Sequence, residues 1–109
     1  MVADVFQVLA EPRRRDVLAL LAHQERTAGD IAARFDVTRQ AISQHLRILL
    51  QAGLIEERRE GTRRWYRARP EGLTEIRRYV EAMWPDALEA LKTAAEREHA
   101  SGARDAARN

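Results

Sequence analysis

The sequence of 109 residues contains no cysteine and a single lysine, Lys92. Without cysteine the chain can form neither a disulfide framework nor a thiolate-ligated metal centre. No apolar run reaches the roughly 18–20 residues that a membrane span requires, and the N-terminus lacks the basic-then-apolar pattern of a signal peptide. We therefore expect a cytoplasmic protein that binds no metal and no other cofactor.

The length allows one small domain with a thin hydrophobic core, which apolar surface from a second subunit would enlarge. We expect residues 1–100 to form this domain. Residues 101–109 are small and charged, and we expect them to form a disordered tail.

Basic charge is concentrated in the middle of the chain. Residues 39–69 hold eight arginines against three glutamates, a net charge of +5, whereas the whole chain has a formal charge of only +2. This concentration indicates a polyanionic partner, with a solvated charged surface as the alternative. Three further arginines, at positions 13–15, begin an expected helix, which is the unfavourable end of the helix dipole for cations. A purpose other than helix stability is therefore expected for them.

Apolar periodicity, capping residues and turn residues predict a mainly α-helical chain with a small β-hairpin. We expect helices at residues 2–9, 12–23, 28–35 and 39–52, strands at 54–59 and 62–69, and a last helix at 73–99. Pro85 should kink or split that last helix. Two helices joined by a tight turn and followed by a hairpin are typical of a winged helix-turn-helix domain.

The expected helix at residues 39–52 has two different sides. On a helical projection an apolar stripe contains Ile42, Leu46 and Leu49, polar side chains lie opposite it, and His45 lies on the flank. Glutamine pairs with adenine, arginine with guanine, and serine with a base or a phosphate. An ordinary solvated helix face usually carries glutamate and lysine, which are absent here. The residues of this segment that we predict to contact DNA are Thr38, Arg39, Gln40, Ser43, Gln44, His45 and Arg47.

The predicted hairpin has a basic tip around Glu60 and Gly61. At a hairpin tip, arginines project beyond the domain and can bind phosphates or enter a minor groove. Charge that protects an edge strand from aggregation is the alternative explanation. The arginines that we predict to contact DNA here are Arg58, Arg59, Arg63 and Arg64. Trp65 and Tyr66 point to opposite faces of their strand, so one of them should pack on the core.

Five segments, at residues 11–15, 30–35, 38–46, 50–55 and 58–67, read EPRRR, DIAARF, TRQAISQHL, LQAGLI and RREGTRRWYR. Together they resemble the ArsR/SmtB family of bacterial winged helix repressors, over roughly residues 3–95. The resemblance implies a recognition helix at residues 38–50 in the DNA major groove, and repression that a signal relieves. It also implies a homodimer whose interface joins the first and last helices. The apolar residues that we expect at this interface are Val2, Val5, Phe6, Leu9, Tyr79, Val80, Met83, Trp84, Leu88 and Leu91.

Metal-sensing members of this family carry cysteines on the third helix, and residues 25–30 contain none here. The last helix offers Asp86, Glu96, Glu98 and His99, without the Asp-x-His spacing of the family's other metal site. The sequence resembles the metal-free branch instead. We therefore expect a sequence-specific DNA-binding repressor that acts as a homodimer on a palindromic operator. The alternatives are a metal-responsive repressor with Asp, His and Glu ligands, and a winged helix that contacts protein or RNA. No pattern of residues indicates an enzyme.

Overall fold

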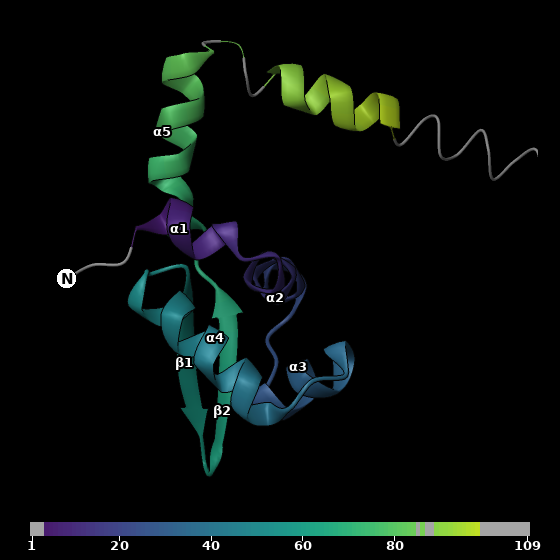
Figure 1. Cartoon of the computed structure of the whole chain (residues 1–109), viewed down its shortest axis with the longest axis vertical. Coiled ribbons are helices and arrows are strands. Elements are labelled where there is room, and N and C mark those ends of the chain that lie inside the picture. Colours follow the sequence, from purple (N-terminus) through teal and green to yellow (C-terminus); the bar gives the residue numbers. More distant parts are fainter. Residues whose placement is uncertain (1–3, 85, 87–88, 99–109) are drawn as a thin grey trace, which may run out of the picture. The chain divides into compact units, whose positions relative to one another are not determined.

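The computed structural model describes residues 4–84, 86 and 89–98 (Figure 1). Its contacts divide the chain into two units, Met1–Ile76 and Arg77–Asn109. The first unit holds the helices α1 (Val5–Ala10), α2 (Pro12–His23), α3 (Ala28–Phe35) and α4 (Arg39–Gln51). These helices are followed by the strands β1 (Ile55–Glu60) and β2 (Arg63–Ala68) and by a short 3-10 helix, η1 (Pro70–Leu73). The prediction of a mainly helical winged helix-turn-helix domain is confirmed.

Side-chain caps mark the starts of α1, α3 and α4. The Thr27 hydroxyl accepts a hydrogen bond from the Asp30 amide at 3.2 Å, and the Thr38 hydroxyl accepts one from the Ala41 amide at 3.1 Å. Each cap satisfies a backbone N–H that the first turn of a helix leaves without a partner. Asp4 caps α1 in the same way through the Phe6 amide, so α1 begins three residues later than the sequence indicated.

The hairpin is antiparallel and closes through the two residues Gly61 and Thr62, since Glu60 pairs directly with Arg63. Gly61 has φ of 61°, a left-handed conformation that glycine adopts without strain. The linker between α2 and α3 extends this sheet: Arg26 and Tyr66 exchange two backbone hydrogen bonds, of 3.0 and 2.9 Å. The hairpin is thereby attached to the helix-turn-helix segment.

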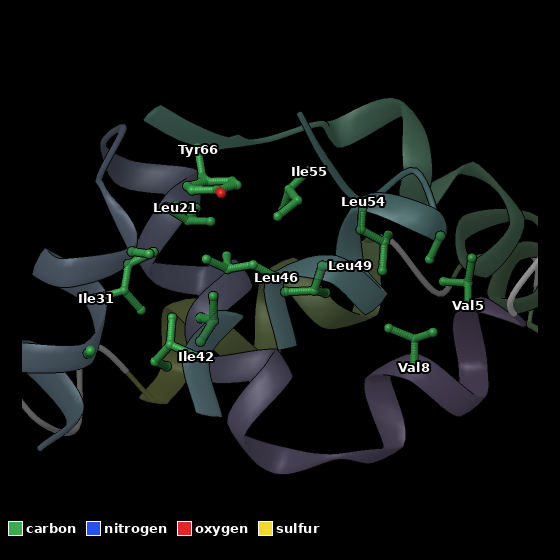
Figure 2. Close-up of a cluster of buried hydrophobic side chains, with 14 residues drawn as sticks. Val5, Val8, Leu21, Ile31, Ile42, Leu46, Leu49, Leu54, Ile55 and Tyr66 are labelled. Atoms are coloured by element: carbon green, nitrogen blue, oxygen red, sulfur yellow. The ribbon is translucent and has the colours of Figure 1, made fainter. Parts of the chain in front are cut away.

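One hydrophobic core holds the first unit together (Figure 2). Ile42, Leu46 and Leu49 of α4 are buried in it, together with side chains from α1, α2, α3 and the hairpin. Tyr66 is buried while Trp65 is half-buried, so Tyr66 is the aromatic residue of the hairpin that packs on the core. Contacts join α4 to α2, α3 and β1, and these contacts fix which side of α4 faces outward.

The arginines at the start of α2 bind backbone carbonyls at the end of α1. Arg14 Nη1 donates to the carbonyl oxygen of Val8 at 3.2 Å, and Arg15 Nη1 donates to that of Leu9 at 2.7 Å. The last carbonyls of a helix have no partner within the helix, so these guanidinium groups satisfy them. Arg13 instead lies over the ring of Phe35, 4.9 Å from its centroid. These tertiary contacts therefore explain why three arginines stand at the start of α2, where the helix dipole is unfavourable for cations.

The expected last helix is interrupted near the position that the sequence indicated. Helix α5 covers Thr74–Met83, and residues 89–98 are again helical. Pro85, where we expected the break, lies outside the described residues, as do residues 99–109 with the expected tail. Within the described part of the chain, no helix is both long enough and apolar enough to span a bilayer.

Two glycines allow a matched test of the packing. A Cβ added to Gly72 would lie 2.3 Å from the carbonyl oxygen of Gly53, whereas a Cβ on Gly29 would meet nothing closer than the Thr27 hydroxyl at 4.0 Å. We expect Gly72→Ala to lower the free energy of unfolding by about 1–3 kcal/mol, as overpacking does. Gly29→Ala should raise it by about 0.5–1 kcal/mol, because alanine is the better helix former. Urea denaturation of both variants checks this pair, and equal effects would contradict the close approach at Gly72.

Candidate nucleic-acid interface

The outward side of α4 carries the polar side chains that the helical projection placed opposite the core. Gln40, Ser43, Gln44 and Arg47 are all exposed, and so is Arg39 in the first turn. Burial of Ile42, Leu46 and Leu49 holds the helix in this orientation. These five exposed residues present amide, hydroxyl and guanidinium groups without any carboxylate. We call them the α4 polar face.

A hollow of about 500 Å³ lies between the helices and the hairpin tip. Its walls come from three parts of the first unit, namely the start of α3, the first half of α4 and the hairpin. The polar side chains among its lining residues are Thr27, Asp30, Arg39, Ser43, Thr62, Arg63, Arg64 and Tyr66. Three arginines and several hydroxyls around one concave surface suit an anionic ligand.

The register of the hairpin sorts its arginines onto two faces. Directly paired residues lie on the same face of an antiparallel pair, and every second residue shares that face. Arg59 pairs with Arg64, and both share a face with the buried Tyr66. Arg58 pairs with Trp65 on the opposite face. Like charges directly opposite one another are unfavourable in a sheet, so the Arg59–Arg64 pair favours an anion bound between or beside the two side chains.

Ion pairs distinguish the arginines further. Arg58 binds Glu25 at 3.1 Å and Glu60 at 2.9 Å, and Arg67 binds Glu56. Hydrogen bonds to Glu60 and Glu25 raise the pKa of Arg58 above its ordinary value. Within the described residues, none of the arginines on the α4 polar face or in the hollow has an ion-pair partner, nor does Arg59. The unpaired arginines Arg39, Arg63 and Arg64 therefore gather around the hollow, whereas Arg58 is neutralised by its two glutamates.

His45 lies between the exposed and buried sides of α4. It is half-buried, and its Nδ1 accepts a hydrogen bond from Arg14 Nε at 3.3 Å. Burial and the positive charges of Arg14 and Arg13 lower the pKa of His45 below its ordinary value, against a smaller opposing effect of Glu11. The structure thus gives His45 a contact inside the subunit, and its contact with DNA stays a prediction.

The residues expected at a dimer interface fall into three groups. Val2 and Leu88 lie outside the described residues. Val5 is buried in the core of its own subunit, while Leu9 and Val80 are half-buried. The large apolar side chains that remain exposed are Phe6, Tyr79, Met83, Trp84 and Leu91.

Sequence reasoning missed the contribution of α3 to this surface. Thr27 and Asp30 line the hollow, together with Ala28 and Gly29 between them. Thr27 and Asp30 form the cap of α3, and a local cap of this kind gives no sign that the start of the helix lies beside the hairpin. Among the residues that the structure describes, no three histidine, aspartate or glutamate side chains are grouped to hold a metal ion. His99, one of the candidate ligands of the metal-responsive alternative, lies outside these residues.

Comparison with known proteins decides the family. A model of a helix-turn-helix domain matches residues 9–58. The HTH-type transcriptional regulator Rv2034 of Mycobacterium tuberculosis is 40% identical over 83 residues, which are 76% of this chain and 78% of that protein. The solution structure of the winged helix-turn-helix domain of Mb0332 from Mycobacterium bovis, described as a possible ArsR-family regulator, is 36% identical. It covers 77% of this chain and 78% of its own, with a TM-score of 0.60. The chain belongs to the ArsR/SmtB family of winged helix-turn-helix transcriptional regulators.

A further relative of this ArsR/SmtB chain is the transcriptional repressor SdpR of Bacillus subtilis. It is 45% identical over 58 residues, which are 53% of this chain. The chain spans 64% of that repressor, slightly less than two thirds of its length. In this ArsR/SmtB regulator, α3 and α4 are the helix-turn-helix pair and the hairpin is the wing.

Proposed function

We propose that this protein is a sequence-specific DNA-binding repressor that acts as a homodimer on a palindromic operator. The observation that carries the proposal is the α4 polar face beside three wing arginines, Arg59, Arg63 and Arg64, which have no ion-pair partner within the described residues. SdpR is named a transcriptional repressor, and the Mb0332 domain is described as homodimeric and DNA-binding. Both names agree with the proposal. It places the protein in the cytoplasm and assigns it no enzymatic activity.

In this proposal α4 enters the major groove and reads bases. Gln40, Ser43, Gln44 and Arg47 are the residues that reach base edges, since amide, hydroxyl and guanidinium groups match the donors and acceptors exposed there. Thr38 and Arg39 lie at the start of α4, where the helix dipole attracts a phosphate. Base contacts by α4 supply specificity, and phosphate contacts fix its register on the duplex.

The wing supplies phosphate contacts that do not depend on sequence. Arg63 and Arg64 line the hollow beside Arg39 and Ser43, so one strand of the duplex can pass between wing and α4. Arg59 stands directly opposite Arg64 on the same face. Arg58 is neutralised by two glutamates, so we assign it to the wing's own stability and not to this contact.

Exposed apolar side chains support the proposal of a homodimer. Met83 is 68% exposed and Trp84 is 51% exposed, although both are large apolar side chains. Apolar patches on a small protein mark contact surfaces, and a second copy is the partner that fits a palindromic site. Two copies would hold their α4 helices one DNA turn apart, about 34 Å. Phe6, Tyr79 and Leu91 are the other exposed members of the proposed interface.

Two arginines of β2 and one of α4 test this assignment. On a duplex selected from a random-sequence pool by the unaltered protein, we expect Arg47→Ala to lose about 1–3 kcal/mol of binding free energy and to relax the preference at one base pair. Arg64→Ala should weaken all duplexes alike and reduce the slope of log K against log salt by about 0.9 for each subunit's lost contact.

Arg67→Ala is the matched control, because Arg67 lies three residues further along the same strand and pairs with Glu56 on the opposite face. Fluorescence anisotropy titrations at several salt concentrations measure all three variants. If Arg64→Ala and Arg67→Ala lose affinity equally, the phosphate contact is not at the hollow. A protein that binds no duplex at all would instead favour the alternative of a protein-binding or RNA-binding winged helix.

A further inference from the structure

One arginine side chain contacts two helices that have different roles in the proposed function. Arg14, at the start of α2, donates from Nη1 to the carbonyl oxygen of Val8 in α1 and from Nε to His45 Nδ1 in α4. The two distances are 3.2 and 3.3 Å, and Arg14 is half-buried. The same guanidinium therefore ties the position of α4 to that of α1.

His45 is well placed to affect DNA recognition without touching DNA. It directly follows Gln44 and precedes Arg47 by two residues, and both of these belong to the α4 polar face. Its neighbour on the other side, Leu46, is buried in the core. A movement of the His45 side chain away from Arg14 would therefore change how the polar face is presented.

The contact requires a neutral imidazole. Nδ1 accepts a hydrogen bond only while it carries no proton, and a protonated ring has donors on both nitrogens. The charged groups that face His45 are Arg14, Arg13 and Glu11, all at the start of α2, while α1 has no charged side chain between Val5 and Ala10. Two arginines outweigh one glutamate, so protonation would place a third cation in a partly buried position.

We propose that Arg14 is a positioning residue which holds the recognition helix α4 through neutral His45, and that protonation of His45 breaks this contact and weakens binding to DNA. The inference rests on the proposed function. The burial and the arginines that lower the pKa of His45 keep the contact intact near neutral pH. Acid sensitivity is thus a property that the proposed function alone does not require.

The sign of the pH effect distinguishes this role from a direct contact with DNA. A histidine that binds phosphate gains charge on protonation, so its DNA affinity rises as the pH falls. A histidine that must stay neutral to hold α4 gives the opposite result. Because the two roles predict opposite signs, one titration decides between the inference and our sequence-based expectation that His45 contacts DNA.

The experiment measures the affinity of the full chain for the selected duplex by fluorescence anisotropy, at constant ionic strength, from about pH 8 to about pH 5. This range extends below the ordinary titration of histidine, because the pKa of His45 is lowered. For the unaltered protein we expect affinity to fall on acidification, by at most about tenfold per pH unit for each proton and therefore about a hundredfold for the two His45 side chains of a dimer. His45→Asn keeps an acceptor near the position of Nδ1 and does not titrate. Its affinity should therefore be the same at about pH 8 and at about pH 5, whatever its absolute value.

Two further variants separate positioning from general damage to the fold. Arg14→Gln should bind more weakly near pH 8 and show a flattened pH profile, because the bridge between α1 and α4 is weakened before any proton binds. His23→Asn is the matched control, since His23 is exposed at the end of α2 and should leave the profile unchanged. Thermal melts of the free proteins report whether each variant is folded at each pH.

The outcomes that overturn the inference are specific. Affinity that rises on acidification, and stops rising in His45→Asn, would assign His45 to phosphate contact. A flat profile, or an acid loss that persists in His45→Asn, would also overturn the inference while leaving the proposed function intact. Failure of the unaltered protein to bind any duplex at any pH would overturn the proposed function and the inference together.

Discussion

Replacing Trp84 with glutamate is expected to convert a dimer into a monomer that binds its operator about 10²–10⁴-fold more weakly, because the second recognition helix is no longer tethered to the first. Trp84 is half exposed at the end of α5, and Met83 beside it is more exposed still. A carboxylate in the middle of an apolar contact must give up its hydration without gaining a partner. Sedimentation measures the oligomeric state, and anisotropy measures the affinity.

Ala82→Glu is the matched control for this variant. It adds the same charge to the same turn of α5, and two residues along a helix turn the side chain by about 200°, to the side away from Trp84. Ala82 is exposed, so the variant should stay dimeric and keep its affinity. A Trp84→Glu protein that remains a dimer, or a control that dissociates equally, would show that the dimer forms through another surface.

Leu49→Ala is expected to lower the free energy of unfolding by about 2–5 kcal/mol, the range found when a buried leucine leaves a cavity. Leu49 is fully buried, on the side of α4 that faces the core. A domain of this size has few kcal/mol to spare, so a large fraction of the protein should be unfolded at physiological temperature. DNA affinity per folded molecule should change little, because the α4 polar face is unaltered.

Gln51→Ala serves as the control for Leu49→Ala, since Gln51 is exposed near the end of the same helix and surface substitutions stay within about 0.5 kcal/mol. Urea denaturation gives both free energies, with the midpoint and slope fitted separately. A loss of less than about 1 kcal/mol for Leu49→Ala would mean that the surrounding core closes over the missing side chain.

Local spacing in the sequence was enough to predict most of the elements. The helices at 12–23 and 28–35 have the expected bounds, and α4 ends within one residue of its expected end. Gly53, two residues after the end of α4, adopts a left-handed conformation with φ of 73°, as glycines that follow helices commonly do. Caps, turn glycines and apolar periodicity each involve residues only a few positions apart, so the elements that they define can be predicted from the sequence. The exposure of the polar side of α4 follows from the same periodicity.

Sequence reasoning was weaker for the first helix, which begins at Val5 and not at residue 2, because the Asp4 carboxylate caps it. Helix α5 ends at Met83 and residues 89–98 are again helical, so the interruption near Pro85 was expected from the sequence. The exact end of a helix depends on context within one or two residues. The role of each segment in a dimer stays a prediction.

The sequence by itself determined the order of the elements, the polar and apolar sides of α4 and the concentration of arginine around the wing, because each depends on neighbours a few positions apart. Only the tertiary structure decided which arginines are neutralised. Glu25 reaches Arg58 across 33 positions, and Arg14 reaches His45 across 31. The tertiary structure also determined that Tyr66, and not Trp65, packs in the core, and that the start of α3 lines the hollow. Such pairings depend on how packed elements meet in space, which no local pattern of residues encodes.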